Sequence, residues 1–463
     1  MQSMMWLLVF IIVISTIRES SAQSGERARR PRVPTRISGI EMYIPSEEAP
    51  NAGVAVKVSL PEHERYSDGS PVIIHVGGGL GSDGLNVAGG NMTQHGFVEV
   101  RFAFAGGGSP GFKSGGTWDF RGRSSIRMMA DVTRFAMGQV PNKEGKYLRD
   151  ISGNIRILNR VVGYAGWSHG GNASVISMAE HGDEFPEFAF VAMHESPLGD
   201  GIVSAELGGF GGEPNPAYNP DTGVLDLSLL AYDPAATTVR PRGGRQAGQL
   251  KPEIAALKGA LYYDCNRNGQ LDEEGDFRLN PVLVELPDKA PFVPFSLQVL
   301  EEVARRNLII GKWPEHILTL NNVREFWFRR DGSWRISEAV RNCPNVKIIV
   351  YGNEIDHVQR TADHVHLLTA VEGFLNAGAR FVRLNPDRSY VEHIMGTPVD
   401  HLADNPAGKH YDHLSIRSAL EPAAERGRRL DRVYMAAAMC ELADRTYAGN
   451  MEPNLDGVID TQR

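Results

Sequence analysis

Short apolar runs rich in β-branched residues alternate along this chain with segments whose apolar positions recur every three or four residues. The runs "PVIIHV", "FVEVRFAF", "RVVGYAG", "FAFVAM" and "KIIVYG" have the composition of strands that are buried on both faces of a sheet. Between such runs, residues 124–140 show helical spacing and residues 169–182 have the composition of a small-residue helix. Strands that alternate with helices predict a mainly parallel α/β sheet.

The alternation is interrupted between residues 198 and 340, which are rich in Gly, Pro, Asn and Asp at first and helical later. This stretch is far longer than an ordinary loop, so we expect a cap insertion between two parts of one core, residues 36–197 and 341–463. The further elements that we expect are strands at 36–45, 53–61, 345–352 and 379–386, and helices at 295–307, 357–378 and 420–446, the last at the edge of the sheet.

The amino-terminal segment has the features of an export signal. The apolar run from Met5 to Ile14 suits the core of a signal peptide and is too short to span a bilayer comfortably. Small residues at Ser20 and Ala22 suit signal peptidase, so we expect a signal peptide at residues 1–22, a disordered leader at 23–35 and a periplasmic or extracellular protein. Because no Lys or Arg precedes the apolar run, an uncleaved short anchor is the alternative. We expect no other membrane span.

Composition narrows the class of protein. The chain of 463 residues is 42% hydrophobic, which is typical of a soluble globular protein. A formal net charge of -8 and the absence of a long basic stripe argue against nucleic acid as a partner. The chain has three widely spaced cysteines, which allow at most one disulfide, so a large packed core must supply the stability.

The pattern G-x-S-x-G occurs twice, as "GWSHG" around Ser168 and as "GGSPG" around Ser109. In a nucleophile elbow the serine stands on a strained turn between a strand and a helix, and the next N–H points at the developing oxyanion. Ser168 has a buried-type strand before it, a helical pattern after it and His169 as the next N–H donor. Ser109 is followed by Pro110, which has no N–H. We therefore predict that Ser168 is a nucleophile and that Ser109 is a turn residue.

The acid and the base of such a site should follow the serine in that order. The predicted acid is Asp356, just past the strand "KIIVYG", with Glu354 as the fallback and helix capping as the other role for Asp356. The base should lie in a loop after the last strand. The predicted base is His393, which is the closest histidine to the end of that strand, and the alternatives are His401, His410 and His413.

The glycine-rich segment "HVGGG", residues 75–79, ends an early strand and allows close approach of the backbone. We expect an oxyanion hole formed by the N–H groups of His169, Gly78 and Gly79. Which of Gly77, Gly78 and Gly79 donates stays open at this stage, and a plain glycine turn is the alternative.

These motifs, in the order "HVGGG", "GWSHGG", "GNEIDH" and a late histidine, resemble the α/β-hydrolase family. The "GWSHGG" elbow is similar to that of the prolyl-oligopeptidase-like branch, and "TWDFRGRSS" resembles the D-x-R-G segment that many members place after their fourth strand. The resemblance covers roughly residues 36–197 and 341–415 and implies a cap after the sixth core strand. The chain has no room for an amino-terminal propeller and its insertion matches no known cap, so an esterase is nearly as well supported as a peptidase.

An acidic stretch in the insertion, "DCNRNGQLDEEGD", is similar to a calcium-binding loop. Gly269 stands at position six, where the loop turns sharply, but Gly275 stands at position twelve, where a closing carboxylate is usual. The closing carboxylate would therefore be Glu274 or Asp276. The alternative is a solvated acidic turn. The candidate ligands are Asp264, Asn266, Asn268, Gln270, Asp272 and Asp276.

The predicted function is an exported serine hydrolase that cleaves a small ester or peptide substrate through an acyl-enzyme on Ser168. No cofactor is expected for catalysis, and Ca²⁺ would have a structural role. The alternative is a non-catalytic extracellular binding protein on the same scaffold, stabilised by calcium. A metal-dependent hydrolase that uses the late histidines is a third hypothesis, but no H-E-x-x-H spacing supports it. Substrate and oligomeric state do not follow from the sequence.

Overall fold

A computed structural model describes most of the second of two units into which the chain divides, residues 1–37 and 38–463. The predicted signal peptide and leader therefore lie outside the described residues, as does His401. In the part of the chain that is described, no helix combines the length and apolar character needed to cross a membrane. The described residues are 39–79, 81–87, 89–199, 206–208, 214–237, 258–272, 274–279, 295–309, 319–359, 361–399, 402–421 and 428–449.

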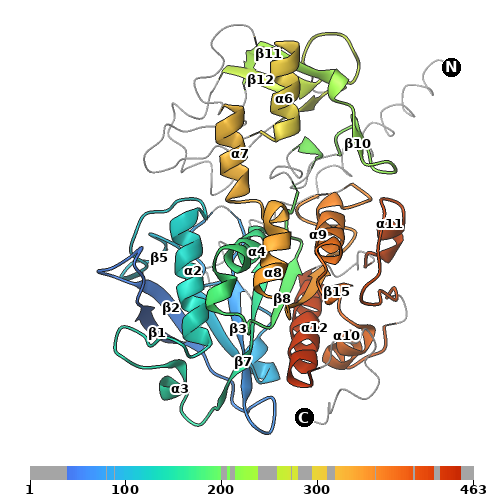
Figure 1. Cartoon of the computed structure of the whole chain (residues 1–463). Helices are drawn as coiled ribbons and strands as arrows, with labels where there is room; N and C mark the ends of the chain where they lie inside the picture. The colour runs from blue at the N-terminus through green and yellow to red at the C-terminus, as the bar shows by residue number, and fades with distance from the viewer. Residues whose placement is uncertain are drawn as a thin grey trace, which may run out of the picture. The chain divides into compact units, whose positions relative to one another are not determined.

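An eight-stranded sheet forms the core, in the order β1-β2-β4-β3-β7-β8-β14-β15 (Figure 1). β2 pairs antiparallel with both β1 and β4, and every other neighbouring pair is parallel. The expected mainly parallel α/β sheet is thus confirmed. The strands are β1 (Ile40–Ile44), β2 (Val54–Ser59), β3 (Ser70–Val76), β4 (Val98–Phe102), β7 (Ile157–Trp167), β8 (Phe190–His194), β14 (Lys347–Tyr351) and β15 (Phe381–Leu384).

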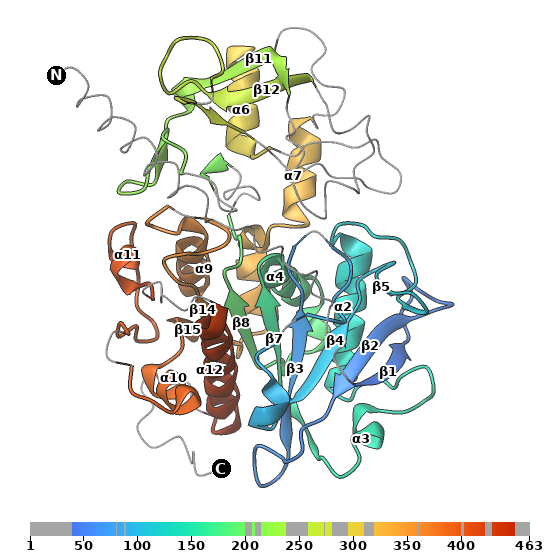
Figure 2. The same ribbon diagram turned by 180° about the vertical axis from the view of Figure 1, so that it is seen from behind.

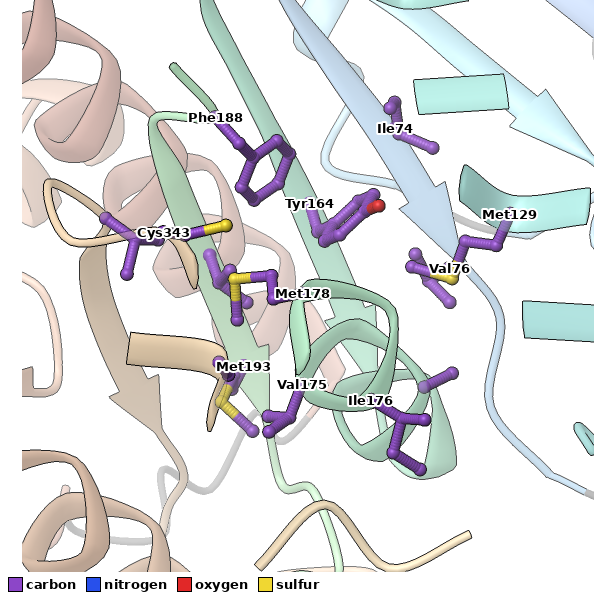
Figure 3. Packing of buried hydrophobic residues seen from close by; sticks show 14 of the residues in the cluster. Ile74, Val76, Met129, Tyr164, Val175, Ile176, Met178, Phe188, Met193 and Cys343 are labelled. Carbon is purple, nitrogen blue, oxygen red and sulfur yellow. The ribbon is translucent and has the colours of Figure 1, made fainter. Parts of the chain in front are cut away.

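Both faces of the central strands are buried, because side chains alternate between two hydrophobic clusters. In β3, Val72 and Ile74 belong to one cluster, whereas Ile73 belongs to the other. The first cluster also contains residues of α2 (Arg123–Ala136), α4 (His169–His181), α8 (Ile336–Asn342) and α9 (Val365–Asn376). Figure 3 shows side chains of β3, β7 and β8 meeting those of α2 and α4. Strands that are covered on both faces have continuous apolar sequences, which is why these strands could be predicted from the sequence.

The opposite cluster is covered by α12 (Arg428–Tyr447), next to α10 (Arg388–Met395) (Figure 2). α12 contacts β7, β8 and β14, so it crosses the middle of one face, and the expectation that it packs at the edge is wrong. Its run of small side chains explains the close packing, since Ala436, Ala437 and Ala438 are nearly fully buried. The described part of this helix runs from Arg428, and residues 422–427 of the expected helix lie outside the described residues.

The predicted insertion lies between β8, the sixth sheet strand in chain order, and β14. It has an antiparallel sheet and a hydrophobic cluster of its own, to which Leu261, Phe295 and Trp327 belong. The core resumes slightly earlier than residue 341, because Ile336 of α8 packs in the first core cluster. The main elements of the insertion are β11 (Leu230–Thr237), β12 (Lys258–Tyr263), β13 (Phe277–Arg278), α6 (Leu297–Arg306) and α7 (Leu320–Phe328).

Candidate functional site

Ser168 stands on a sharp turn between β7 and the first residue of α4. Its backbone angles are φ 53° and ψ −127°, a conformation that a side-chain-bearing residue rarely adopts. The turn is held by the Ser168 N–H, which donates to the carbonyl oxygen of His194 at 2.8 Å. The strand, the strained serine and the helix together form the predicted elbow geometry.

Glycine on either side of the serine permits this turn. A Cβ on Gly170 would lie 2.1 Å from the carbonyl oxygen of Val76, and one on Gly166 would lie 2.7 Å from the backbone nitrogen of Gly171. Ser109, by contrast, lies in a short hairpin of β5 (Gly108–Ser109) and β6 (Phe112–Lys113). Ser109, predicted to be a turn residue, is the last residue of β5, and the turn itself is at Pro110 and Gly111.

The glycine-rich segment after β3 lies against the elbow. A Cβ on Gly78 would lie 2.6 Å from the carbonyl oxygen of Trp167 and 2.7 Å from the Cβ of Ser168. Gly79 has a φ of +70°, which glycine adopts without steric cost. His169 is the first residue of α4, where backbone N–H groups have no partner within the helix. Of the three residues predicted for the oxyanion hole, His169 directly follows Ser168 and Gly78 packs against it. Gly79 is the next residue of the same glycine loop.

A buried arginine holds this loop in place. The Arg121 guanidinium donates to the carbonyl oxygens of Gly77 at 2.6 Å and of Gly78 at 3.1 Å. Burial lowers the pKa of Arg121 to about 9. Asp119 accepts hydrogen bonds from the N–H groups of Gly122 and Ser124, so the same segment caps α2. The D-x-R-G resemblance located this segment, and the structure adds the contact with the glycine loop.

Asp356 follows β14 and is 1% exposed. Its carboxylate accepts from the N–H of Val358 at 2.6 Å and contacts Nε2 of His366 at 2.8 Å. The fallback acid, Glu354, donates its backbone N–H to the carbonyl oxygen of Glu421. Asp356 thus has a histidine partner, but it is not one of the histidines after β15.

His393 does not lie at this site. It is an exposed residue of α10 beside His95, whose pKa is lowered by burial and in part by the Arg65 and His393 charges. His95 precedes the start of β4, whereas Ser168 follows the end of β7, and both strands run parallel to β3. His95 and His393 therefore lie at the amino ends of the parallel strands, whereas Ser168 lies at their carboxyl ends. The prediction of His393 as the base is corrected.

The other late histidines that are described have carboxylate partners elsewhere. Nδ1 of His410 contacts Glu372 at 2.7 Å on the surface. Nδ1 of His413 contacts the Asp363 carboxylate at 2.9 Å, and the same carboxylate accepts from the Tyr218 hydroxyl at 2.5 Å. Within the described residues, no hydrogen bond joins either ring to the elbow.

A different histidine–carboxylate pair lies near the serine. Nδ1 of His357 is hydrogen-bonded to the carboxylate of Glu195, which follows β8. The His357 ring lies 5.4 Å from the ring of Trp167, and its charge also acts on His169, so His357 neighbours both residues that flank Ser168. No hydrogen bond to its other ring nitrogen, Nε2, occurs among the described residues.

The charges around His357 and Glu195 favour an ionised glutamate beside the histidine. Burial by itself raises the pKa of the Glu195 carboxyl, but the His194 and His357 rings outweigh burial and hold that pKa well below its usual range. Burial, Arg121 and His357 lower the pKa of His169 to about 3. At neutral pH, Glu195 is therefore an anion that can orient His357, and the His169 ring is neutral.

Sequence reasoning missed this pair because it expected a helix from residue 357, whereas α9 begins only at Val365. The sequence does contain a signal for Glu195. Glu195 directly follows the parallel strand β8, as Ser168 directly follows β7, and the carboxyl ends of parallel strands meet on one side of the sheet.

The calcium-like loop is a series of turns closed by its own acidic side chains. The Asp264 carboxylate accepts from the N–H of Gly269 at 2.9 Å, and Asp272 accepts from the side-chain amides of Asn266 at 2.6 Å and Asn268 at 3.0 Å. Asp276 accepts from the backbone N–H groups of Cys265 and Asp272. The backbone N–H of Gln270 donates to the side chain of Asn268 at 2.8 Å. Five of the six predicted side chains thus take part in hydrogen bonds within the loop.

Comparisons with known proteins give matches among solved structures alone. No family model matches the chain, and no curated protein matches its sequence. A thermostable esterase from Pseudomonas putida is similar over 88% of this chain and 83% of its own, at 10% identity and a TM-score of 0.36. A puromycin hydrolase is similar over 91% of this chain and 40% of its own, at 12% identity and a TM-score of 0.38. The fold class, a mainly parallel α/β-hydrolase sheet, rests on the sheet and the strand–serine–helix turn described above.

Proposed function

We propose that the protein is a serine hydrolase that cleaves an ester or amide bond through an acyl-enzyme on Ser168. The observation that carries the proposal is the strained serine between β7 and α4, with Gly78 against its Cβ and the His357–Glu195 pair next to its neighbours. A strained backbone at a side-chain-bearing residue is typical of functional sites.

In this mechanism Nε2 of His357 takes the proton of the Ser168 hydroxyl while Oγ attacks the carbonyl carbon of the substrate. Glu195 accepts from Nδ1–H of His357, which keeps the ring oriented and stabilises it once protonated. His357 then gives the proton to the leaving alcohol or amine. A water molecule, deprotonated by the same ring, releases the acid product and restores the serine. His357 and Glu195 take the roles that the sequence suggested for His393 and Asp356.

The negative charge that develops on the carbonyl oxygen would be stabilised by backbone N–H groups of His169 and of Gly78 or Gly79. Such donors act strongly because they are already oriented before the reaction. Arg121 supports the loop by holding the carbonyl oxygens of Gly77 and Gly78, so it is a positioning residue.

A fluorophosphonate probe tests the nucleophile. The folded wild-type chain should be labelled on Ser168, and Ser168→Ala should not be labelled. Ser109→Ala, which changes the other G-x-S-x-G serine, is the matched control and should be labelled like wild type. Absence of labelling in folded wild-type protein would favour the non-catalytic binding protein. A comparison of p-nitrophenyl esters with aminoacyl anilides then separates esterase from peptidase activity.

We further propose that the loop from Asp264 to Asp276 binds a structural Ca²⁺. The Asp264 carboxylate at position one already accepts a hydrogen bond from the N–H of Gly269 at position six. Asp272 at position nine accepts hydrogen bonds from the side-chain amides of Asn266 and Asn268, so the candidate ligands already lie close together. Calcium would then stabilise the insertion and take no part in the chemistry.

We also propose that the protein is exported. The support is the apolar run and the small residues at Ser20 and Ala22. Mass spectrometry of the secreted or periplasmic protein should find an amino terminus at Gln23, and an intact Met1 on a membrane-associated chain would favour the anchor instead.

A further inference from the structure

A second group of buried ionisable side chains lies next to the proposed base, and the hydrolase mechanism does not use it. Asp356, His364 and His366 are 1%, 2% and 0% exposed. One ligand atom from each of the three lies within 4.8 Å of the others. Burying three ionisable groups together is unfavourable unless something compensates their loss of water.

The distances within the group are those of metal ligands. Oδ2 of Asp356 lies 2.8 Å from Nε2 of His366 and 3.9 Å from Nδ1 of His364. Ligand atoms bound tetrahedrally at about 2.0–2.1 Å from one zinc ion are about 3.3 Å apart, which is the middle of this range. Small side-chain rotations would bring all three atoms to a common ion.

His364 has an unsatisfied nitrogen that faces the group. Nδ1 is buried and has no hydrogen-bond partner among the described residues, although the ring is 98% buried and points at Asp356. Buried side-chain nitrogens in folded proteins are nearly always satisfied, so an orphan of this kind calls for a partner outside the protein.

His366 has the orientation of a metal-bound imidazole. Its Nδ1 lies 3.1 Å from the amide oxygen of Gln359, to which it can only donate. With Nδ1–H donating there, the lone pair of Nε2 faces the Asp356 carboxylate at 2.8 Å, and a cation between these two acceptors would stabilise the contact. That cation is either a second proton on His366 or a metal. A metal-ligating histidine commonly donates its other N–H to such an oxygen.

The surrounding charge favours a cation. Carboxylates of Asp356, Asp363 and Glu195 all act electrostatically on His364. Two of these carboxylates have histidine partners, because Glu195 pairs with His357 and Asp363 pairs with His413. A divalent ion here would therefore enter a region of excess negative charge.

We propose that Asp356, His364 and His366 bind one divalent transition-metal ion, with zinc the best match for two imidazoles and a carboxylate. Three protein ligands leave one position for water. The ion would join the loop after β14 to the start of α9, and so hold the residue next to Asp356, His357, in place. The proposal rests on these three side chains and stands whether or not Ser168 is a nucleophile.

The test uses Co²⁺ as a spectroscopic substitute for zinc on the full chain, after chelation and with saturating Ca²⁺ to occupy the calcium-like loop. We expect one Co²⁺ per chain with the intense visible absorption of a tetrahedral site, displaced by one equivalent of Zn²⁺. His364→Gln and His366→Gln should each lose that absorption and weaken binding at least 100-fold. His410→Gln is the matched control, because His410 also pairs with a carboxylate but is exposed.

Binding of neither Co²⁺ nor Zn²⁺ by the folded wild-type chain would overturn the proposal and assign the cation between His366 and Asp356 to a proton. Equal binding in wild type and in both glutamine variants would overturn it as well. Should a variant not fold, the stoichiometry and spectrum of the wild-type protein decide the question. Labelling of Ser168 is a separate readout, so failure of the metal site and failure of the hydrolase proposal are distinguishable.

Discussion

Nδ1 of His357 is hydrogen-bonded to the carboxylate of Glu195, across 162 residues of sequence. Glu195 follows β8 and His357 lies in the loop after β14, and these two strands are parallel neighbours. Their carboxyl ends therefore bring the imidazole and its acid together beside the elbow that follows β7, the next strand of the sheet.

Replacing the proposed base should reduce catalysis without unfolding the protein. We expect kcat/KM of His357→Gln to fall by about 10²–10⁴-fold, the usual contribution of a positioned general base. His393→Gln should keep wild-type kcat/KM, because His393 is exposed on α10 at the other edge of the sheet. Steady-state hydrolysis of a p-nitrophenyl ester measures both, and the reverse ranking would restore His393 as the base.

Glu195 should affect catalysis through its hydrogen bond to His357. Glu195→Gln keeps the shape of the side chain but removes the negative charge that orients and stabilises the His357 ring. We expect kcat to fall on the order of 10²–10⁴-fold with little change in KM. Single-turnover acylation followed by stopped flow measures the step, and unchanged acylation in this variant would contradict the Glu195 role.

Arg121 should affect the glycine loop. Arg121→Met leaves the carbonyl oxygens of Gly77 and Gly78 without their donor, so the oxyanion donors lose their alignment. We expect a loss of kcat on the order of 10²-fold. Arg123→Met, an exposed arginine two residues further on, serves as the control. Full activity of a folded Arg121→Met protein would show that the loop does not need this support.

Glu421 should make stability depend on pH. Burial raises its pKa to about 7 from the ordinary 4.5. The folded state therefore keeps a proton that the unfolded state has released between these pH values, and the free energy of unfolding falls as pH rises from about 4.5 to about 7. The loss is about 3 kcal/mol at most.

Glu421→Gln should abolish that part of the pH dependence, measured by urea unfolding at pH 5 and pH 8. Glu187→Gln, at an exposed carboxyl, should leave the dependence unchanged. A wild-type curve as flat as that of Glu421→Gln would contradict the raised pKa.

Calcium should stabilise the insertion. Removal of Ca²⁺ with EGTA should lower the melting temperature on the order of 5 °C, and added Ca²⁺ should restore it. Asp272→Asn reduces the charge at position nine and should make the melting temperature insensitive to Ca²⁺. Identical melting curves with EGTA and with Ca²⁺ would leave the loop as an acidic turn held by its own hydrogen bonds.

The sequence by itself determined the architecture of the core and the place of the strained serine turn. Strands buried on both faces carry continuous apolar runs such as "PVIIHV", and a turn as tight as that at Ser168 requires the flanking glycines. Both signals are local, because each depends on residues that are adjacent in the chain. The proline after Ser109 is another local signal, because a residue without an N–H cannot serve as the oxyanion donor.

Only the tertiary structure decided which histidine accompanies the serine. Proximity along the chain to the last strand favoured His393, but α10 carries that residue to the opposite edge of the sheet. Because α9 begins only at Val365, His357 lies in a loop where it contacts Glu195. Asp356 is hydrogen-bonded to His366 and lies 3.9 Å from Nδ1 of His357. These pairings depend on the paths of loops between distant strands, and those paths follow from packing over the whole sheet rather than from any local pattern.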